Sequence, residues 1–269
     1  MSPRAWSLSP LELTVLWHAL GREILPYPLQ HRPTQETVEE YERAYKSAAT
    51  RVQSIFDEDL YGPLRILIEP EARIEVAGFA RSAEGVRPGA EPDPMALIRL
   101  HAAVSGQSAV MLTQESTPDP YRGGPVRMAI VGTRTIAARI IASLPSTPRG
   151  SGPSFRINRA DLDAYDDQPF TGLGDETPRS PRTEVQRFFE RPRTTLAHIA
   201  VYPGPAYDNR PTATRDFHVM DYPDGRYRVH SAAAIQAVPA EAADLTAHLQ
   251  AVLDRTLQQY WEDTDPVYT

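Results

Sequence analysis

The chain has 269 residues, of which 41% are hydrophobic and 23% charged, so it can bury a sizeable core and is not a disordered protein. A net charge of −7 without a long basic run argues against nucleic-acid binding, and no apolar stretch approaches transmembrane length. The absence of cysteine excludes disulfides and thiolate chemistry and, with no apolar signal core at the N-terminus, fits a cytosolic protein.

Two helices are predicted near the N-terminus. Ser9 and Glu12 form a capping box that opens the first helix, which ends near Gly21. A second capping box at Thr37–Glu40 opens a longer helix, whose apolar residues recur every three or four positions up to Phe56. This apolar stripe indicates packing on the protein's own core, with a docking face for a partner helix as the alternative.

Strand signals and one helix signal follow. The runs predict strands at 73–81, 95–104, 107–114 and 126–131 and a helix at 136–144. The first strand alternates between polar and apolar residues, as a half-buried strand does. A polar loop at 82–94 separates it from the second strand, and loops of this length are often functional.

The last part of the chain repeats this order of elements. Residues 146–179, rich in Pro, Gly and Asp, are predicted to be a linker with little regular structure, followed by a short helix that begins at Ser180-Pro181. Strands are then predicted at 195–202, 215–222, 226–231 and 233–238, with a helix from Pro239 to Trp261. A two-residue turn at Asp224-Gly225 would place Asp221 opposite Arg228.

Strands followed by a helix thus appear twice, with almost no residue matches between the two copies. The pattern is compatible with a pseudo-twofold fold of two ββββα-like halves, at about 1–145 and 180–269. We expect one compact domain over 1–269 that unfolds in a single cooperative transition.

The sequence offers no constellation typical of an enzyme. Lys46 is the only lysine, so a phosphate-binding loop is absent, and neither a zinc-protease motif nor a nucleophile elbow occurs. His218 and His230, with His101 or His198, could form a metal site, but without tight ligand spacing ordinary sheet positions are favoured. The aspartates at 161–167 lack the glycine and alternation of a calcium loop. We therefore expect no turnover, no cofactor and no tightly bound metal.

Several weak motifs occur in a characteristic order. They are Leu8–Trp17 with Leu25-Pro26 after it, Gly123–Val126 leading to Ile136–Pro145 and Pro148–Gly150, and Asp221–Arg228 before the C-terminal helix. On these residues, nearly the whole chain resembles the EspG family, cytosolic chaperones of actinobacterial type VII secretion. The sequence of the 82–94 loop departs from the family pattern, although its position corresponds to a partner-contacting loop.

The resemblance implies an α+β fold with a central, mainly antiparallel sheet of quasi-twofold symmetry, flanked by helical bundles. It also implies a cytoplasmic monomer or weak homodimer that binds the tip of a PE–PPE heterodimer or a PPE-like protein and delivers it to a secretion machine with an AAA+ ATPase. The resemblance implies no catalytic residues and no cofactor, and we expect the protein to bind neither nucleic acid nor a membrane. A small-molecule-binding regulatory domain is the alternative; a divergent hydrolase would need a nucleophile–base pair that the sequence does not offer.

Strand alternation predicts where the client docks: on an open face of the central sheet, beside the 82–94 loop. The residues predicted to bind it are Arg99, His101, Thr113, Arg127, Phe217, Arg228 and His230 on the sheet, and Arg81, Glu84, Arg87 and Asp93 at the loop. Arg99 is expected to lie at the centre, so that Arg99→Glu would weaken client binding about tenfold or more with the fold intact. The alternative is that a helix covers this face and its polar groups pair internally.

Overall fold

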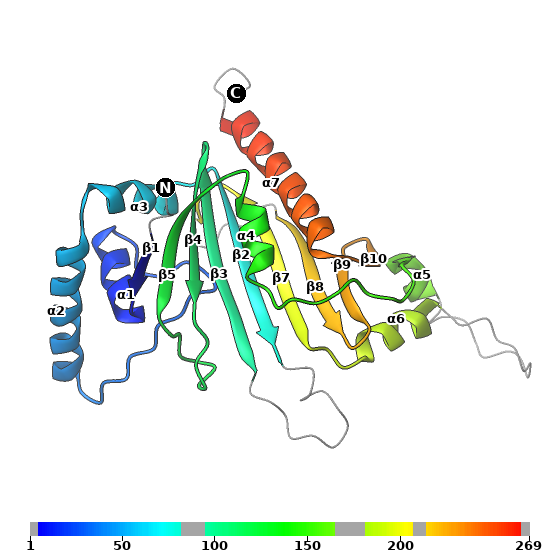
Figure 1. Cartoon of the computed structure of the whole chain (residues 1–269), viewed down its shortest axis with the longest axis horizontal. Coiled ribbons are helices and arrows are strands. Elements are labelled where there is room, and N and C mark those ends of the chain that lie inside the picture. The colour runs from blue at the N-terminus through cyan, green and yellow to red at the C-terminus, as the bar shows by residue number, and fades with distance from the viewer. Residues whose placement is uncertain (1–4, 82–94, 165–180, 207–213, 265–269) are drawn as a thin grey trace, which may run out of the picture.

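A single ten-stranded sheet forms the centre of the molecule (Figure 1). The computed structural model describes residues 5–81, 95–164, 181–206 and 214–264. Every strand pairs antiparallel with its neighbours, in the order β1-β5-β4-β3-β2-β7-β8-β9-β10-β6. The described residues also form seven helices, so the predicted α+β class and central antiparallel sheet are confirmed.

The strands follow a regular path through the sheet. They are β1 (Ala5–Leu8), β2 (Ala72–Ala80), β3 (Ala96–Ser105), β4 (Ser108–Gln114), β5 (Val126–Gly132), β6 (Phe155–Asn158), β7 (Thr195–Pro203), β8 (Arg215–Tyr222), β9 (Gly225–Ser231) and β10 (Ala234–Pro239). β2 and β7 meet in the middle, and from each the next three strands run outward. Helix α4 (Ile136–Ala142) follows the first run and α7 (Ala242–Thr264) the second. A pseudo-twofold relation between the halves stays a prediction.

The N-terminal helices begin at the predicted caps. The Ser9 hydroxyl accepts from the Glu12 N–H, and the Glu12 carboxylate accepts from the Ser9 N–H, at the start of α1 (Pro10–Ala19). Thr37 caps α2 (Val38–Ile55) in the same way, but the Glu40 carboxylate accepts from the Glu36 N–H, so only half of that box forms.

A third N-terminal helix, α3 (Glu58–Ile68), was not predicted. Asp57 caps it by accepting from the Leu60 N–H, and two acidic residues occupy its first turn. Pro63 stands inside this helix, where proline removes a hydrogen bond, and its presence hid the helical signal.

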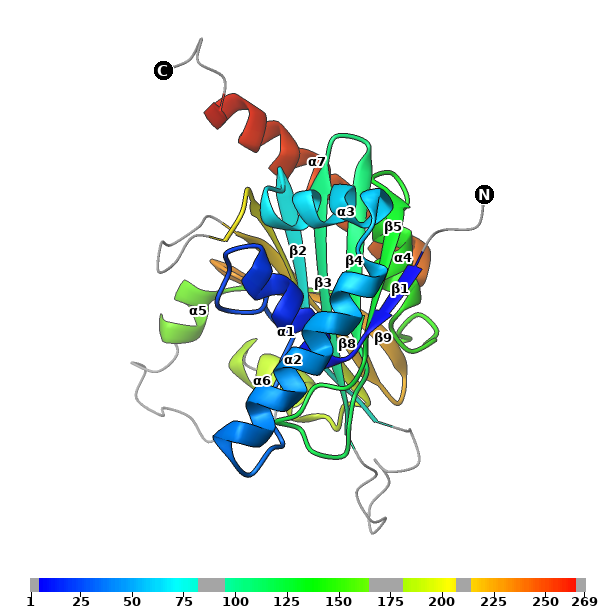
Figure 2. The same cartoon turned by 90° about the vertical axis from the view of Figure 1, so that its left-hand side faces the viewer.

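Helices cover both faces of the sheet. On the face we call the α7 face, α4 and α7 bury Ile74, Leu100 and Phe217 in one core. On the opposite face, which we call the α1 face, α1, α2 and α3 pack over β3, β4 and β5, as Figure 2 shows. Farther along the α1 face, Phe188 of α6 (Pro181–Glu190) packs with residues of β8 and β9 in a smaller aromatic cluster. No helix in the described part of the chain is long and apolar enough to cross a bilayer.

The β8–β9 hairpin differs in register from the prediction. Tyr222 pairs with Gly225, and Asp221 stands opposite Arg226, not Arg228. Gly225 has φ +120°, a conformation that suits glycine, so it ends the turn, and Pro223-Asp224 are its two central residues. The shift of two residues leaves the faces unchanged but brings the Asp221 and Arg226 side chains together, with both oxygens of the carboxylate accepting from the guanidinium at 2.6 and 2.7 Å.

A buried latch joins this hairpin to the segment after α4. The Arg226 guanidinium donates to the Pro145 carbonyl at 2.6 Å, and the Thr147 hydroxyl donates to the Asp221 carboxylate at 2.9 Å. The Arg226 N–H donates to the Pro148 carbonyl, and the Gly150 N–H to the Arg226 carbonyl. Segment 145–150 is therefore fixed in place.

The prediction of an irregular linker at 146–179 is thus wrong for its first part. β6 pairs with β10 at the edge of the sheet, with Ile157 opposite Ile235, and α5 (Arg159–Ala164) follows it. Four residues are too few for strand periodicity to emerge from a Pro- and Gly-rich background. Residues 165–179 lie outside the described regions. The predicted C-terminal helix is also displaced, because Pro239 ends β10 and α7 spans 242–264.

Candidate partner-binding surface

The residues predicted to bind the client lie on both faces of the sheet. Arg99 and His101 lie on the α1 face. Residues that pair across neighbouring strands point to the same face, and Leu100 of the α7 core pairs with Thr113, which in turn pairs with Arg127. On β8 and β9, Val219 of the same core pairs with Arg228. The α7 face therefore carries Thr113, Arg127, Phe217, Arg228 and His230. The alternation within each strand was predicted correctly, but pairing register decides which residues of different strands share a face. The expectation of one open face shared by all these residues is therefore wrong.

Three of these residues lie under α7. The Phe217 side chain is fully buried, with its ring 4.8 Å from the His248 ring of α7 and 5.9 Å from the His230 ring, measured between centroids. Burial lowers the pKa values of Arg228 and His230. Helix α7 therefore covers Phe217, Arg228 and His230, as the alternative prediction of a helix over this face expects. Arg127, near the edge formed by β1, is exposed.

His198 and His218 lie on one face of the sheet and His230 on the other, so these histidines do not come together as a metal site. The His218 ring stacks on His198 across β7 and β8 on the α1 face, with centroids 4.6 Å apart, whereas His230 contacts Phe217 and His248 on the other face. Within the described ranges, no three His, Cys, Asp or Glu side chains are placed to hold a metal ion.

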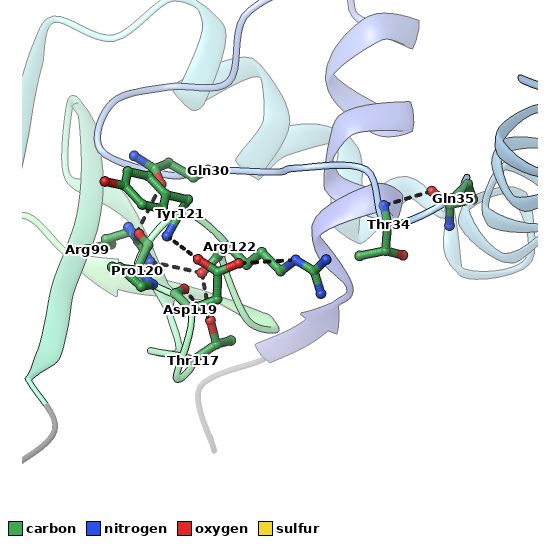
Figure 3. Close-up of polar contacts among 9 residues, drawn as sticks. All are labelled: Gln30, Thr34, Gln35, Arg99, Thr117, Asp119, Pro120, Tyr121 and Arg122. Carbon is green, nitrogen blue, oxygen red and sulfur yellow. Dashed lines mark hydrogen bonds and ion pairs between the residues drawn. The ribbon is translucent and has the colours of Figure 1, made fainter. Parts of the chain in front are cut away.

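Arg99 is an internal clamp. The residue is 6% exposed, and its guanidinium donates to the Pro120 carbonyl at 2.6 Å, the Gln30 amide oxygen at 3.0 Å and the Arg122 carbonyl at 3.4 Å (Figure 3). It therefore ties β3 to the β4–β5 loop and to the segment between α1 and α2.

Of the predicted loop residues, only Arg81 lies in a described region. It is exposed, with its guanidinium 5.2 Å from the centre of the Phe79 ring. Glu84, Arg87 and Asp93 lie outside the described residues.

His101 is buried beside Arg99. Its Nδ1 lies 2.9 Å from the Tyr27 carbonyl oxygen, and because that oxygen can only accept, Nδ1 carries the proton. Burial, together with the charge of Arg73, lowers the pKa of His101 to about 4. Burial likewise lowers the pKa of His248 to about 4.

These two histidines predict a pH dependence of stability. Between about pH 4 and 6.5 the unfolded chain binds protons that the folded chain does not, so the free energy of unfolding should fall as the pH is lowered through this window. His101→Gln keeps a donor for Tyr27 but does not titrate, so urea unfolding should show a shallower pH slope than in the wild type. An unchanged slope would mean that His101 is not held neutral.

Between the helices on the α1 face, the middle of the sheet presents a mixed surface that we call the central patch. It consists of Glu75, Ala77 and Phe79 of β2, Leu196 and His198 of β7, and Asp216 and His218 of β8, all half-buried or exposed. The His198 imidazole and the Asp216 carboxylate lie 2.9 Å apart, with side-chain exposures of 39% and 45%. Burial lowers the pKa of His218, and the charge of His198 lowers it further.

A cavity of about 570 Å³ borders the central patch. Its apolar walls include Trp17, Ile24, Leu25, Tyr27, Leu67 and Ile68, and its polar floor is Arg73, Glu75 and His101. Arg73 donates to the Glu75 carboxylate and the Gly204 carbonyl, each at 3.0 Å. Burial raises the pKa of Glu75, opposed by the charge of Arg73. The alternation of β2 predicted that Arg73 and Glu75 lie on its polar face, but no sequence pattern around them indicated that helices and a loop would enclose them.

Comparison with known proteins agrees with the resemblance. A search of curated proteins finds no match to the chain. The family model described as the EspG family (ESX-1 EspG) matches residues 9–251, from the N-cap of α1 into α7. The chain therefore belongs to the EspG family, whose members are non-enzymatic chaperones of type VII (ESX) secretion.

Proposed function

We propose that this protein is a cytosolic chaperone that binds the tip of a PE–PPE heterodimer or a PPE-like protein, keeps it soluble and delivers it to a type VII secretion system. An AAA+ ATPase of that system is the further partner that the resemblance implies. The observation that supports a binding role is the central patch, which lies on the α1 face between two helical layers.

The central patch has the composition and rigidity of an interface. Phe79 and Leu196 supply apolar area, while His198, His218 and Asp216 supply hydrogen-bonding groups. Their strands are hydrogen-bonded on both sides, so the surface is ordered before a client arrives. We assign the client to this patch with Arg81 at its border, and we keep Glu84, Arg87 and Asp93 as proposed rim charges.

A negative charge introduced into the central patch should weaken client binding. His198→Glu would place a carboxylate beside Asp216 in the proposed contact, and we expect affinity for a purified PE–PPE heterodimer to fall about tenfold or more, measured by calorimetry. Arg127→Glu, an exposed change on the α7 face, is the matched control and should leave affinity within about twofold. Equal losses in the two variants, or a loss only in Arg127→Glu, would contradict the assignment.

The cavity at the edge of the central patch favours one alternative function, a small-molecule-binding regulatory domain. Its volume and its combination of apolar walls and a polar floor are typical of ligand sites. A ligand that raises the melting temperature of the wild type, and fails to do so after Leu25→Trp fills the cavity, would support this function in place of the chaperone.

We also propose that residues 1–269 form one cooperative domain with pseudo-twofold halves, present as a monomer or weak homodimer. The strand runs β2–β5 and β7–β10, each followed by a helix on the α7 face, support the symmetry. The β2–β7 pairing and the contact between α4 and α7 support joint unfolding of the halves.

A further inference from the structure

The β4–β5 loop carries a large aromatic side chain into solvent. Tyr121 is 70% exposed, whereas Pro120 before it and Arg122 after it have carbonyl groups bound by Arg99. The ring therefore belongs to a residue whose backbone is held on both sides, by the hydrogen bonds that Figure 3 shows.

Further bonds make this loop rigid. The Thr117 hydroxyl lies 2.8 Å from both the Asp119 and the Arg122 carbonyl oxygens, and the Asp119 carboxylate accepts from the Tyr121 N–H at 2.9 Å. Asp119 and Arg122 also form an ion pair at 3.4 Å. The two charges at the tip thus pair with each other, and the guanidinium of Arg99 is engaged by the Pro120 and Arg122 carbonyls beneath the loop.

The loop is connected to the central patch. Leu97 pairs with Phe79 of the patch, and the Leu97 N–H donates to the Ser116 hydroxyl at the start of the loop. Met95, 39% exposed, lies two residues before Leu97. Phe79 and Leu196 of the patch therefore lie at the same end of the sheet as the loop that carries Tyr121.

We propose that Tyr121 is a second anchor for the client, and that Arg99 is a positioning residue that holds it in its binding orientation. This inference rests on the proposed chaperone function and assigns one occupant, the client bound at the central patch. A rigid exposed aromatic adds contact area at little cost in conformational entropy, and tyrosine is enriched among interface hot spots. Because Asp119 and Arg122 pair with each other and the Arg99 guanidinium is engaged by backbone carbonyls, we infer that the client group that meets the ring is apolar or lies flat on it.

The test is a double-mutant cycle on Tyr121 and Arg99, with a purified PE–PPE heterodimer that the wild type binds. Tyr121→Ala should weaken binding about tenfold or more, by a factor that is the same at low and high salt, while Tyr121→Phe should stay within about threefold. Arg99→Lys should weaken binding when Tyr121 is present and should add nothing in the Tyr121→Ala background.

Each other outcome counts against the proposal. Unchanged affinity for Tyr121→Ala, while His198→Glu still weakens binding, overturns this inference and leaves the proposed function standing. Additive losses would show that Arg99 acts on the fold and not through Tyr121. A change only in the sedimentation of the free Tyr121→Ala variant would assign the ring to self-association, and a wild type that binds no heterodimer would reject the proposed function itself.

Discussion

Replacing Arg226 with methionine is expected to lower the free energy of unfolding by about 3–5 kcal/mol. The Arg226 and Asp221 side chains are 2% and 0% exposed, so the variant would leave a carboxylate in the core without its cation. The guanidinium also supplies the donor for the Pro145 carbonyl, so segment 145–150 would lose one of its attachments to the hairpin. Urea unfolding monitored by circular dichroism measures the effect.

Two further variants make that result specific. Arg139→Met removes an exposed arginine from α4 and should change stability by less than about 0.5 kcal/mol. Adding Asp221→Asn to Arg226→Met removes the unpaired charge and should recover part of the loss, because the main cost is an uncompensated buried charge. If Arg226→Met is as stable as Arg139→Met, the ion pair does not hold the latch together.

Arg99→Glu is expected to destabilise the fold by at least about 3 kcal/mol, contrary to the sequence expectation of a folded variant with weakened binding. The new carboxylate would lie among the Pro120 and Arg122 carbonyl oxygens and the Gln30 amide oxygen, all of which are acceptors. A loss of client binding by this variant would therefore include the effect of a damaged fold, which is why the test of Tyr121 uses Arg99→Lys.

Two further variants test whether the loss of stability in Arg99→Glu comes from the position of this residue or from the change of charge alone. Arg99→Lys keeps a cation and should cost about 1 kcal/mol, because the planar group that reaches three oxygens is lost. Arg127→Glu reverses an exposed charge and should be almost neutral. Should Arg99→Glu unfold at the same urea concentration as the wild type, Arg99 cannot be the clamp described above.

For Arg99, the sequence predicted the face of the strand on which it lies but not its burial. Alternation in β3 correctly separated Arg99 and His101 from Leu100 and its neighbours, because side-chain period is a property of one strand. Burial is a property of the assembled molecule: Arg99 is internal because residues from the 26–35 and 115–125 segments close over it. Neither segment carries a local signal for that contact.

Capping motifs and hydrophobic periodicity were sufficient to predict the helices and strands whose sequence patterns are long and regular. α1, α2 and most strands were found this way, whereas α3 was hidden by Pro63 and β6 by its length of four residues. The hairpin register failed because Asp224-Gly225 is a favoured turn pair, yet the chain places Gly225 after the turn. The central patch was missed because its openness depends on where the helices stop.

The motifs that suggested the family have a structural explanation. The Pro148–Gly150 motif meets the Asp221–Arg228 motif in the buried latch, although they are far apart in the chain. In the Gly123–Val126 motif, a Cβ on Gly123 would lie 1.9 Å from the Gln114 amide and 2.2 Å from the Gln30 carbonyl oxygen. These residues therefore specify close packing of chain segments, which fits a family without catalytic chemistry.

The pairing of β2 with β7 in the middle of the sheet has a consequence for synthesis of the chain. β2 can bond to β3 as soon as that strand is made, but its other edge waits for β7, whose residues lie more than a hundred positions later. At the usual rates of translation this delay is on the order of ten seconds. During that time the edge formed by Ile74 to Gly78 is an unpaired template on the nascent chain, and β2 is open to pairing with a neighbouring polypeptide until β7 is made.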